Sequence, residues 1–213
     1  MPCRTQIRPP RPLPAACRPP PAAPLLPTWR APTQIAVSSF EEDLPKHQYT
    51  PAEYARLTAV HKAVDVAAAL AGPRPADLVV GADTVVELRG EVLEKPADAA
   101  DAHRMLALLS GQRHEVHTGV ALVLPPREAG GDPRVHSFAV TTAVEFAELT
   151  DAAIAAYIQT GEPFGKAGAY GIQGAAAAFV RRVDGCFYSV VGFPLHAFCI
   201  EVAGLIERRE LIL

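Results

Sequence analysis

The sequence of 213 residues lacks several features that would point to particular classes of protein. It contains no apolar run near the roughly 18 residues that a transmembrane helix needs, so we expect no membrane partner. Its net charge of −3 lacks the basic surplus of a nucleic-acid-binding surface, so we expect no nucleic-acid partner. Neither of the common glycine-rich phosphate loops, G-x-x-x-x-G-K-[ST] and G-x-G-x-x-G, is present.

The cysteines also lack any pattern that would indicate a metal site. Cys3 and Cys17 lie in a Pro/Arg-rich segment, and Cys186 and Cys199 lie far downstream, without a C-x-x-C pair among them. A reduced intracellular compartment is the simplest interpretation, and we expect a cytoplasmic protein.

The front of the chain lacks acidic residues. Residues 1–40 contain five Arg and no Asp or Glu, so this segment carries +5 and the remainder −8. Residues 1–33 hold eleven of the 21 prolines, which neither propagate a helix nor enter a central strand. We expect 1–33 to be a disordered Pro/Arg-rich tail and 34–213 to form one domain. Two alternatives stay open for the tail, a targeting segment and a ligand for aromatic-groove domains.

The rest of the sequence alternates between helix and strand patterns. Thr50-Pro51-Ala52-Glu53 predicts a helix start with a capping box, because Thr and Glu at this spacing satisfy each other's backbone N–H groups. Further helices are predicted to begin at Asp98, at Thr150 or Asp151, and near Pro194, and strands are predicted over 35–37, 79–86, 114–124 and 137–146. The pattern predicts an α/β fold in which a mixed twisted sheet is flanked by helices.

The most informative segment is 79–86, an apolar strand with Asp83 in its middle. An ionised carboxylate is unfavourable in such a place unless a cation, a metal or several hydrogen-bond donors meet it. Asp83 is therefore either a structural residue that bonds backbone N–H groups or a functional carboxylate.

Three further residues supply chemistry that complements Asp83. Lys62 lies on the first predicted helix, Lys95 lies in a loop, and Gln173 lies in a glycine-dense loop. Lysines neutralise phosphate oxygens, while a carboxylate holds Mg²⁺ or orients an attacking water. A glutamine offers the donor and acceptor needed to bind the edge of a nucleobase. These residue types favour polyphosphate chemistry, although either lysine could instead be solvated.

The amino-acid sequences of seven segments, taken in their order along the chain, are more specific than these residue types. The segments are 80–86, 93–96, 105–111, 117–120, 161–163, 166–174 and 190–194. Together they closely resemble the Maf family of nucleotide pyrophosphatases over about residues 35–205, and most of all its dTTP/UTP pyrophosphatase branch. The resemblance implies a Maf/inosine triphosphate pyrophosphatase-like fold and hydrolysis of a nucleoside triphosphate to the monophosphate and pyrophosphate. It also implies a divalent metal, Mg or Mn, and is compatible with a homodimer.

The resemblance assigns the acidic residues position by position. Asp83 matches the family's proton acceptor, which would activate water for attack on the α-phosphorus. Glu42 matches an acidic residue near the metal, so Glu42 and Asp83 are the expected metal-binding residues. Glu41 and Asp43 compete with Glu42 for this role, because all three lie in one acidic loop.

The substrate-binding residues follow from the same comparison. Lys62 and Lys95 match the family's phosphate-binding lysines. Thr84 and Gln173 match positions associated with substrate choice, and Gln173 favours thymine or uracil, whose N3–H and O4 it could pair with.

The front of the chain departs from the family pattern. The family's S-x-S-P-R-R-type segment, whose arginines bind the triphosphate, has no match in residues 1–34, and we expect the first core strand to be lacking. Gly165, Cys186 and Ser189 also stand where the family commonly has Asp, Asp and Asn. The alternative hypothesis is therefore a catalytically impaired nucleotide-binding paralogue or a truncated gene product.

Overall fold

One sheet forms the centre of the molecule. The computed structural model describes residues 5–7, 34–72, 76–128 and 131–212. Its strands are β1 (Thr5–Ile7), β2 (Gln34–Ala36), β3 (Val79–Leu88), β4 (Glu91–Leu93), β5 (Arg113–Leu124), β6 (Arg134–Phe146) and β7 (Val180–Asp184). They lie in the order β2-β1-β3-β5-β6-β7, and β4 also pairs with β3. All pairings between these described strands are antiparallel.

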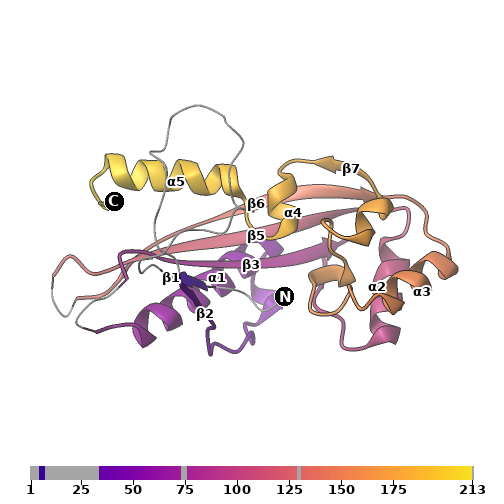
Figure 1. Cartoon of the computed structure of the whole chain (residues 1–213), viewed down its shortest axis with the longest axis horizontal. Coiled ribbons are helices and arrows are strands. Elements are labelled where there is room, and N and C mark those ends of the chain that lie inside the picture. Colours follow the sequence, from indigo (N-terminus) through magenta and orange to yellow (C-terminus); the bar gives the residue numbers. More distant parts are fainter. Residues whose placement is uncertain (1–4, 8–33, 73–75, 129–130, 213) are drawn as a thin grey trace.

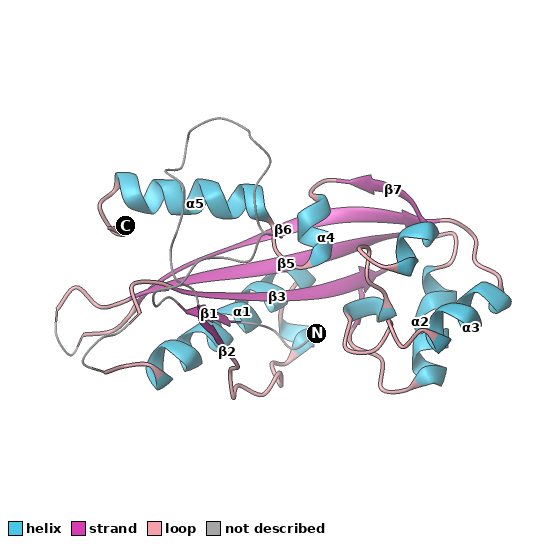
Figure 2. Cartoon of the chain, viewed as in Figure 1, coloured by secondary structure: helices cyan, strands magenta, loops and turns pink. Residues whose placement is uncertain are grey.

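Helices cover both faces of this sheet (Figures 1 and 2). They are α1 (Pro51–Ala69), α2 (Ala99–Leu109), α3 (Asp151–Gln159), α4 (Phe187–Val191) and α5 (Leu195–Glu207). In Figure 1, α1 lies below the strands and α5 above them, while α2 and α3 lie together at one end. The predicted α/β class is confirmed, and the sheet is antiparallel throughout its described strands.

Alternation along the strands explains the two covered faces. Val79 and Val123 pack in a cluster with α1, whereas their neighbours Val80 and Leu122 pack in a cluster with α5. A third cluster joins α2 and α3 to the far end of the sheet around Phe146. Most of β3 and β5 is therefore buried on both faces, and a buried polar side chain on these strands must find its partner inside the protein.

Two glycines let α1 lie unusually close to the sheet. A Cβ built on Gly119 would lie 2.4 Å from backbone atoms of Ala55, and one built on Gly81 would lie 2.7 Å from the carbonyl oxygen of Ala59. No other residue fits at these two positions without moving the helix. The close approach places the buried face of α1 against the middle of β3.

The local signals in the sequence predicted the helix starts correctly. Thr50 forms the capping box with Glu53, and the side chains of Asp98 and Thr150 accept hydrogen bonds at the N-termini of α2 and α3. The predicted strands are present as β2, β3, β5 and β6, with ends that differ by a few residues. No helix among the described residues is both long and apolar enough to cross a membrane.

The front of the chain requires a correction. The expected tail of residues 1–33 includes β1, which pairs with β2 on one side and with β3 on the other. The expectation that this segment adds no strand to the core is therefore wrong at Thr5–Ile7. The reason is physical, since backbone pairing with two neighbouring strands stabilises a strand that its own sequence does not indicate. Residues 1–4 and 8–33 lie outside the described residues.

Candidate active site

Asp83 lies where one edge of β3 is open. On the edge of β3 that faces away from β5, β1 pairs with Val79 and Val80, and β4 pairs with residues 86–88. None of the described strands pairs with residues 81–85 between them. Asp83 is at the middle of this gap and is 8% exposed, so a small ligand can reach a carboxylate that is otherwise buried.

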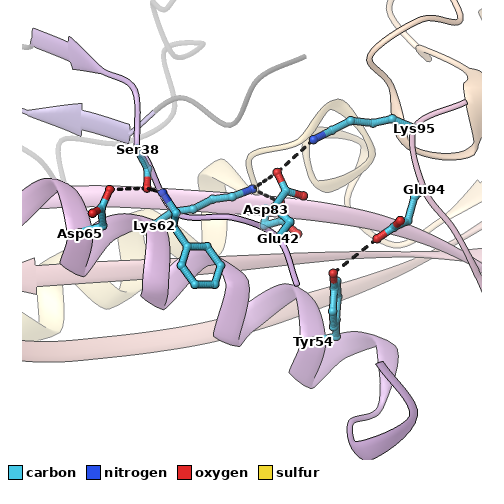
Figure 3. A network of polar contacts seen from close by, with 9 residues as sticks. Ser38, Glu42, Tyr54, Lys62, Asp65, Asp83, Glu94 and Lys95 are labelled. Atoms are coloured by element: carbon cyan, nitrogen blue, oxygen red, sulfur yellow. Dashed lines mark hydrogen bonds and ion pairs between the residues drawn. The ribbon is translucent and has the colours of Figure 1, made fainter. Parts of the chain in front are cut away.

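The ammonium group of Lys62 neutralises this carboxylate. The side chain of Lys62 extends from the buried face of α1, and its Nζ donates to Asp83 Oδ1 at 2.8 Å and to Glu42 Oε1 at 2.7 Å (Figure 3). Only 4% of the Lys62 side chain is exposed. Lys95 Nζ reaches the same Glu42 oxygen at 3.1 Å from the loop after β4. Two carboxylates and two ammonium groups thus alternate in one network.

Hydrogen bonds to α1 hold the acidic loop in place. The carboxylate of Asp65, on α1, accepts hydrogen bonds from Ser38 Oγ at 2.7 Å and from the Ser39 backbone N–H at 2.8 Å. The ring of Phe40 stacks on that of His61 with centroids 4.9 Å apart. These contacts fix the chain immediately before Glu42.

The fixed loop settles which of its three acids enters the network. Glu42 binds Lys62 and Lys95, whereas neither Glu41 nor Asp43 is among the ion pairs of the described residues. The sequence could not separate the three, because the choice depends on how the loop is anchored to α1.

Burial and the nearby lysine charges together raise the pKa of one of these two carboxylates and lower that of the other. Burial raises the pKa of Asp83, and the nearby Lys62 ammonium offsets only part of that rise. Burial alone would raise the pKa of Glu42. The hydrogen bonds and charges of Lys62 and Lys95 outweigh burial, so the pKa of Glu42 lies below its usual value. Asp83 is therefore the carboxylate better able to accept a proton near neutral pH.

A cavity of about 570 Å³ opens beside Asp83. Asp83, Thr84, Lys95 and Gln173 all line it, together with much of the glycine-rich loop 165–174 and the turn at Gly192. The cavity lies between β3, the glycine-rich loop and residues 190–193 at the end of α4. Its volume suits a small-molecule ligand of nucleotide size.

The hydroxyl of Thr84 is oriented by its neighbours. Thr118 Oγ1 donates to the carbonyl oxygen of Ser189 at 2.7 Å, so its proton is committed. Thr84 Oγ1 lies 2.9 Å from Thr118 Oγ1 and must therefore be the donor in that pair. Thr84 consequently presents its oxygen lone pairs as acceptors to the cavity it lines.

All six predicted residues belong to this one region. Glu42, Lys62, Asp83 and Lys95 are joined by direct contacts, while Thr84 and Gln173 are brought to them by the cavity. The sequence alone could not show these contacts, since the residues come from three loops, a helix and a strand.

Two lining residues were not assigned a role from the sequence. Lys166 lines the cavity and its Nζ donates to the backbone oxygen of Glu162. The Glu162 carboxylate accepts hydrogen bonds from Tyr157 Oη at 2.9 Å and from the Ala175 backbone N–H at 3.0 Å. Glu162 thereby holds the two ends of the glycine-rich loop together. The signal was present, because both residues lie in the segments on which the family resemblance rested.

Comparison with known proteins identifies the family. A family model for Maf-like proteins matches residues 23–205. The human probable bifunctional dTTP/UTP pyrophosphatase/methyltransferase protein is 44% identical over 176 residues, which are 81% of this chain and 28% of the human protein. A dTTP/UTP pyrophosphatase of Ralstonia nicotianae is 50% identical over 139 residues, covering 65% of this chain and 62% of that enzyme.

A third relative is matched over more of its length. The dTTP/UTP pyrophosphatase of Symbiobacterium thermophilum is 45% identical over 165 residues, which are 78% of this chain and 79% of that enzyme. The chain thus spans less than two thirds of the human and Ralstonia relatives and most of the Symbiobacterium one. With the family model matched over most of its length, the chain belongs to the Maf-like family.

Proposed function

We propose that this chain hydrolyses dTTP, UTP or a related pyrimidine nucleoside triphosphate to the monophosphate and pyrophosphate. The observation that carries the proposal is the cavity in which a buried carboxylate, Asp83, meets the cation Lys95 and the amide of Gln173. The names of the relatives, dTTP/UTP pyrophosphatase, support the same substrate class.

Asp83 would act as the general base. Its raised pKa makes this carboxylate a stronger base than an exposed one, which suits a group that takes a proton from water. As the water oxygen bonds to the α-phosphorus, the bond from that phosphorus to the α–β bridging oxygen breaks and pyrophosphate leaves. The carboxylate of Asp83 keeps the proton of the attacking water until solvent removes it.

Lysines would balance the charge of the triphosphate. The side chain of Lys95 is 42% exposed, and both Lys95 and Lys166 line the cavity. Both can therefore contact the phosphate oxygens of a nucleotide that enters it. Lys62 is buried behind them and would hold Asp83 in place. The buried position of Lys62 means that it acts mainly through the carboxylates it bridges.

The acidic residues fit a divalent cation. Glu42 Oε1 and Asp83 Oδ1 both lie within 2.8 Å of the Lys62 ammonium, so two carboxylates already converge on one positive charge. Carboxylate oxygens are the ligands that Mg²⁺ and Mn²⁺ prefer. Glu42 and Asp83 would hold such an ion, which would neutralise phosphate charge when bound.

Thr84 and Gln173 would select the base. The amide of Gln173 can accept a hydrogen bond from N3–H and donate one to O4 of thymine or uracil. Thr84 would contribute acceptor lone pairs, as its hydrogen bond to Thr118 dictates.

A pyrophosphate-release assay tests the proposal. Purified protein is incubated with dTTP, UTP or GTP and Mg²⁺ or Mn²⁺, alongside Asp83→Asn and the exposed control Asp132→Asn. We expect release from dTTP or UTP in the wild type and the control, and loss of about two to four powers of ten in Asp83→Asn. Nucleotide binding without release by folded protein would instead establish the impaired paralogue, and a preference for GTP would refute the proposed selectivity for pyrimidine nucleotides.

We also propose that the protein is cytoplasmic and forms a homodimer. The support is the family membership and the free thiols of Cys186 and Cys199, which form no disulfide within the described part of the chain. Light scattering at several concentrations measures the oligomeric state directly.

A further inference from the structure

A second cluster of potential ligands lies on β3 and β5, away from the cavity. Glu87 on β3 is paired with Glu115 on β5, and His117 follows two residues later on the same face of β5. One ligand atom from each of these three residues lies within 4.8 Å of the others. Glu87 is four residues along β3 from Asp83, a separation of about 13 Å at the usual rise of a strand.

His117 supplies the observation that points to a ligand. The residue is 5% exposed, and its Nδ1 lies 2.9 Å from Thr141 Oγ1, which fixes the orientation of the ring. Its buried Nε2 has no hydrogen-bond partner and lies 3.6 Å from Glu115 Oε2, beyond hydrogen-bonding distance. A buried polar atom left without a partner is unfavourable, and this one points into the cluster.

The protonation state of the imidazole fits metal binding. Burial lowers the pKa of His117, and the charges of Glu115 and Glu87 oppose that effect without cancelling it. This direction favours the neutral ring. When Nδ1–H donates to Thr141, Nε2 carries the lone pair that a metal ion requires.

The two glutamates create a demand for positive charge. Like charges directly opposite each other on antiparallel strands destabilise the pair. The arginines nearest along the two strands are used elsewhere, because Arg89 Nη2 donates to Gln112 and Arg113 Nη2 to Asp184. Glu87 Oε1 accepts from the backbone N–H of Gly90, which leaves its second carboxylate oxygen for another partner.

We propose that Glu87, Glu115 and His117 form a binding site for a divalent transition-metal ion, with Zn²⁺ as the ion that these ligands suit best. Zn²⁺ binds both imidazole nitrogen and carboxylate oxygen, and in sites with three protein ligands water completes the tetrahedron. Glu115, whose side chain is 49% exposed, provides the route of entry. The ion crosslinks β3 to β5 and is separate from any ion held by Glu42 and Asp83.

The experiment follows Zn²⁺ binding to the full chain after chelation and desalting. The readouts are competition with a chromophoric zinc indicator, the ¹⁵N shift of His117 Nε2 and the melting temperature. Glu115→Gln removes a ligand at an exposed position, Glu91→Gln is the matched control on the neighbouring β4, and Asp83→Asn removes the carboxylate of the active site.

We expect one equivalent of Zn²⁺ to shift the Nε2 resonance of His117 and to raise the melting temperature in the wild type, Glu91→Gln and Asp83→Asn. Loss of an outer partner already weakens metal sites by about 10–100-fold, so Glu115→Gln should weaken binding at least as much. The proposal is overturned if the His117 resonance does not move, if Glu115→Gln binds like the wild type, or if Asp83→Asn abolishes the site.

Discussion

The buried ion pair between Lys62 and Asp83 makes a sharp prediction for stability. In Lys62→Met the ammonium is lost, while side-chain length and helix propensity are nearly kept. Asp83, 8% exposed, would then be a buried carboxylate without its cation. Removing one partner of such a pair costs about 3–5 kcal/mol of the free energy of unfolding. For a chain of this size, that corresponds to a fall in melting temperature of roughly 10 °C.

Lys95→Met is the matched control. Lys95 also pairs with a carboxylate, but its side chain is 42% exposed and its ion pair with Glu42 spans 3.1 Å. An exposed pair of this kind contributes about 0.2–1 kcal/mol, so Lys95→Met should unfold nearly as the wild type does. Urea unfolding at pH 7 measures both variants.

The pH dependence separates an electrostatic loss from a packing defect. Without Lys62, the folded-state pKa of Asp83 rises further above its unfolded value, because burial is no longer offset. A carboxyl group with a raised folded-state pKa adds stability below its unfolded pKa and loses it as pH rises through the folded one. The deficit of Lys62→Met should therefore shrink from pH 8 to pH 5. In the double variant with Asp83→Asn, at least about 2 kcal/mol of the deficit should be recovered.

Equal stability of Lys62→Met and Lys95→Met would refute this reasoning. A deficit that does not change with pH, or that the double variant does not relieve, would do the same. A deficit of Lys62→Met that is independent of pH, or that remains in the double variant, would mean that Lys62 contributes through packing rather than through its charge.

Three further predictions test other parts of the structure. Gly119→Ala should lower the free energy of unfolding by about 1–3 kcal/mol or more in urea titrations, because its Cβ would lie 2.4 Å from the backbone of α1, whereas Gly72→Ala, whose Cβ would lie 3.9 Å from the carbonyl oxygen of Leu70, should change it little. Burial lowers the pKa of His114 to about 4, so the folded protein should lose up to about 3 kcal/mol as pH falls from 6.5 to 4, and thermal unfolding of His114→Phe should lack this slope. Gln173→Ala should raise the KM for dTTP and UTP about tenfold in the pyrophosphate assay with less effect on kcat, and an equal loss for GTP would contradict its role in base selection.

The sequence predicted those parts of the fold that local chemistry determines. The helix starts at Thr50, Asp98 and Thr150 depend on side chains within three residues of the backbone groups that they bind. β1 was missed because its pairing partners lie about 30 and 70 residues away, and nothing in a Pro/Arg-rich segment signals such pairing. The short helix α4 was also missed, since five residues are too few to show a helical period.

In the candidate site, too, the residues could be predicted from the sequence, whereas the contacts between distant segments could not. Family resemblance found Asp83 and Lys62 separately, but their contact joins a helix to a strand 21 positions away and depends on the close packing of α1 over Gly81. The choice of Glu42 required the anchoring of its loop to Asp65. Metal ligands on facing strands, such as Glu87 and Glu115, become neighbours only when the register of β3 and β5 is known.

The position of Glu42 has a consequence for ligand binding. Its carboxylate accepts hydrogen bonds from Lys62 and Lys95, and so it competes with an incoming triphosphate for the exposed cation Lys95. An incoming phosphate must displace this carboxylate from Lys95 or recruit a cation that lets both anions remain. In the absence of divalent ions, Glu42→Gln should therefore bind inorganic triphosphate more tightly than the wild type. The same residue that prepares the site for a metal would keep it closed to nucleotides that arrive without one.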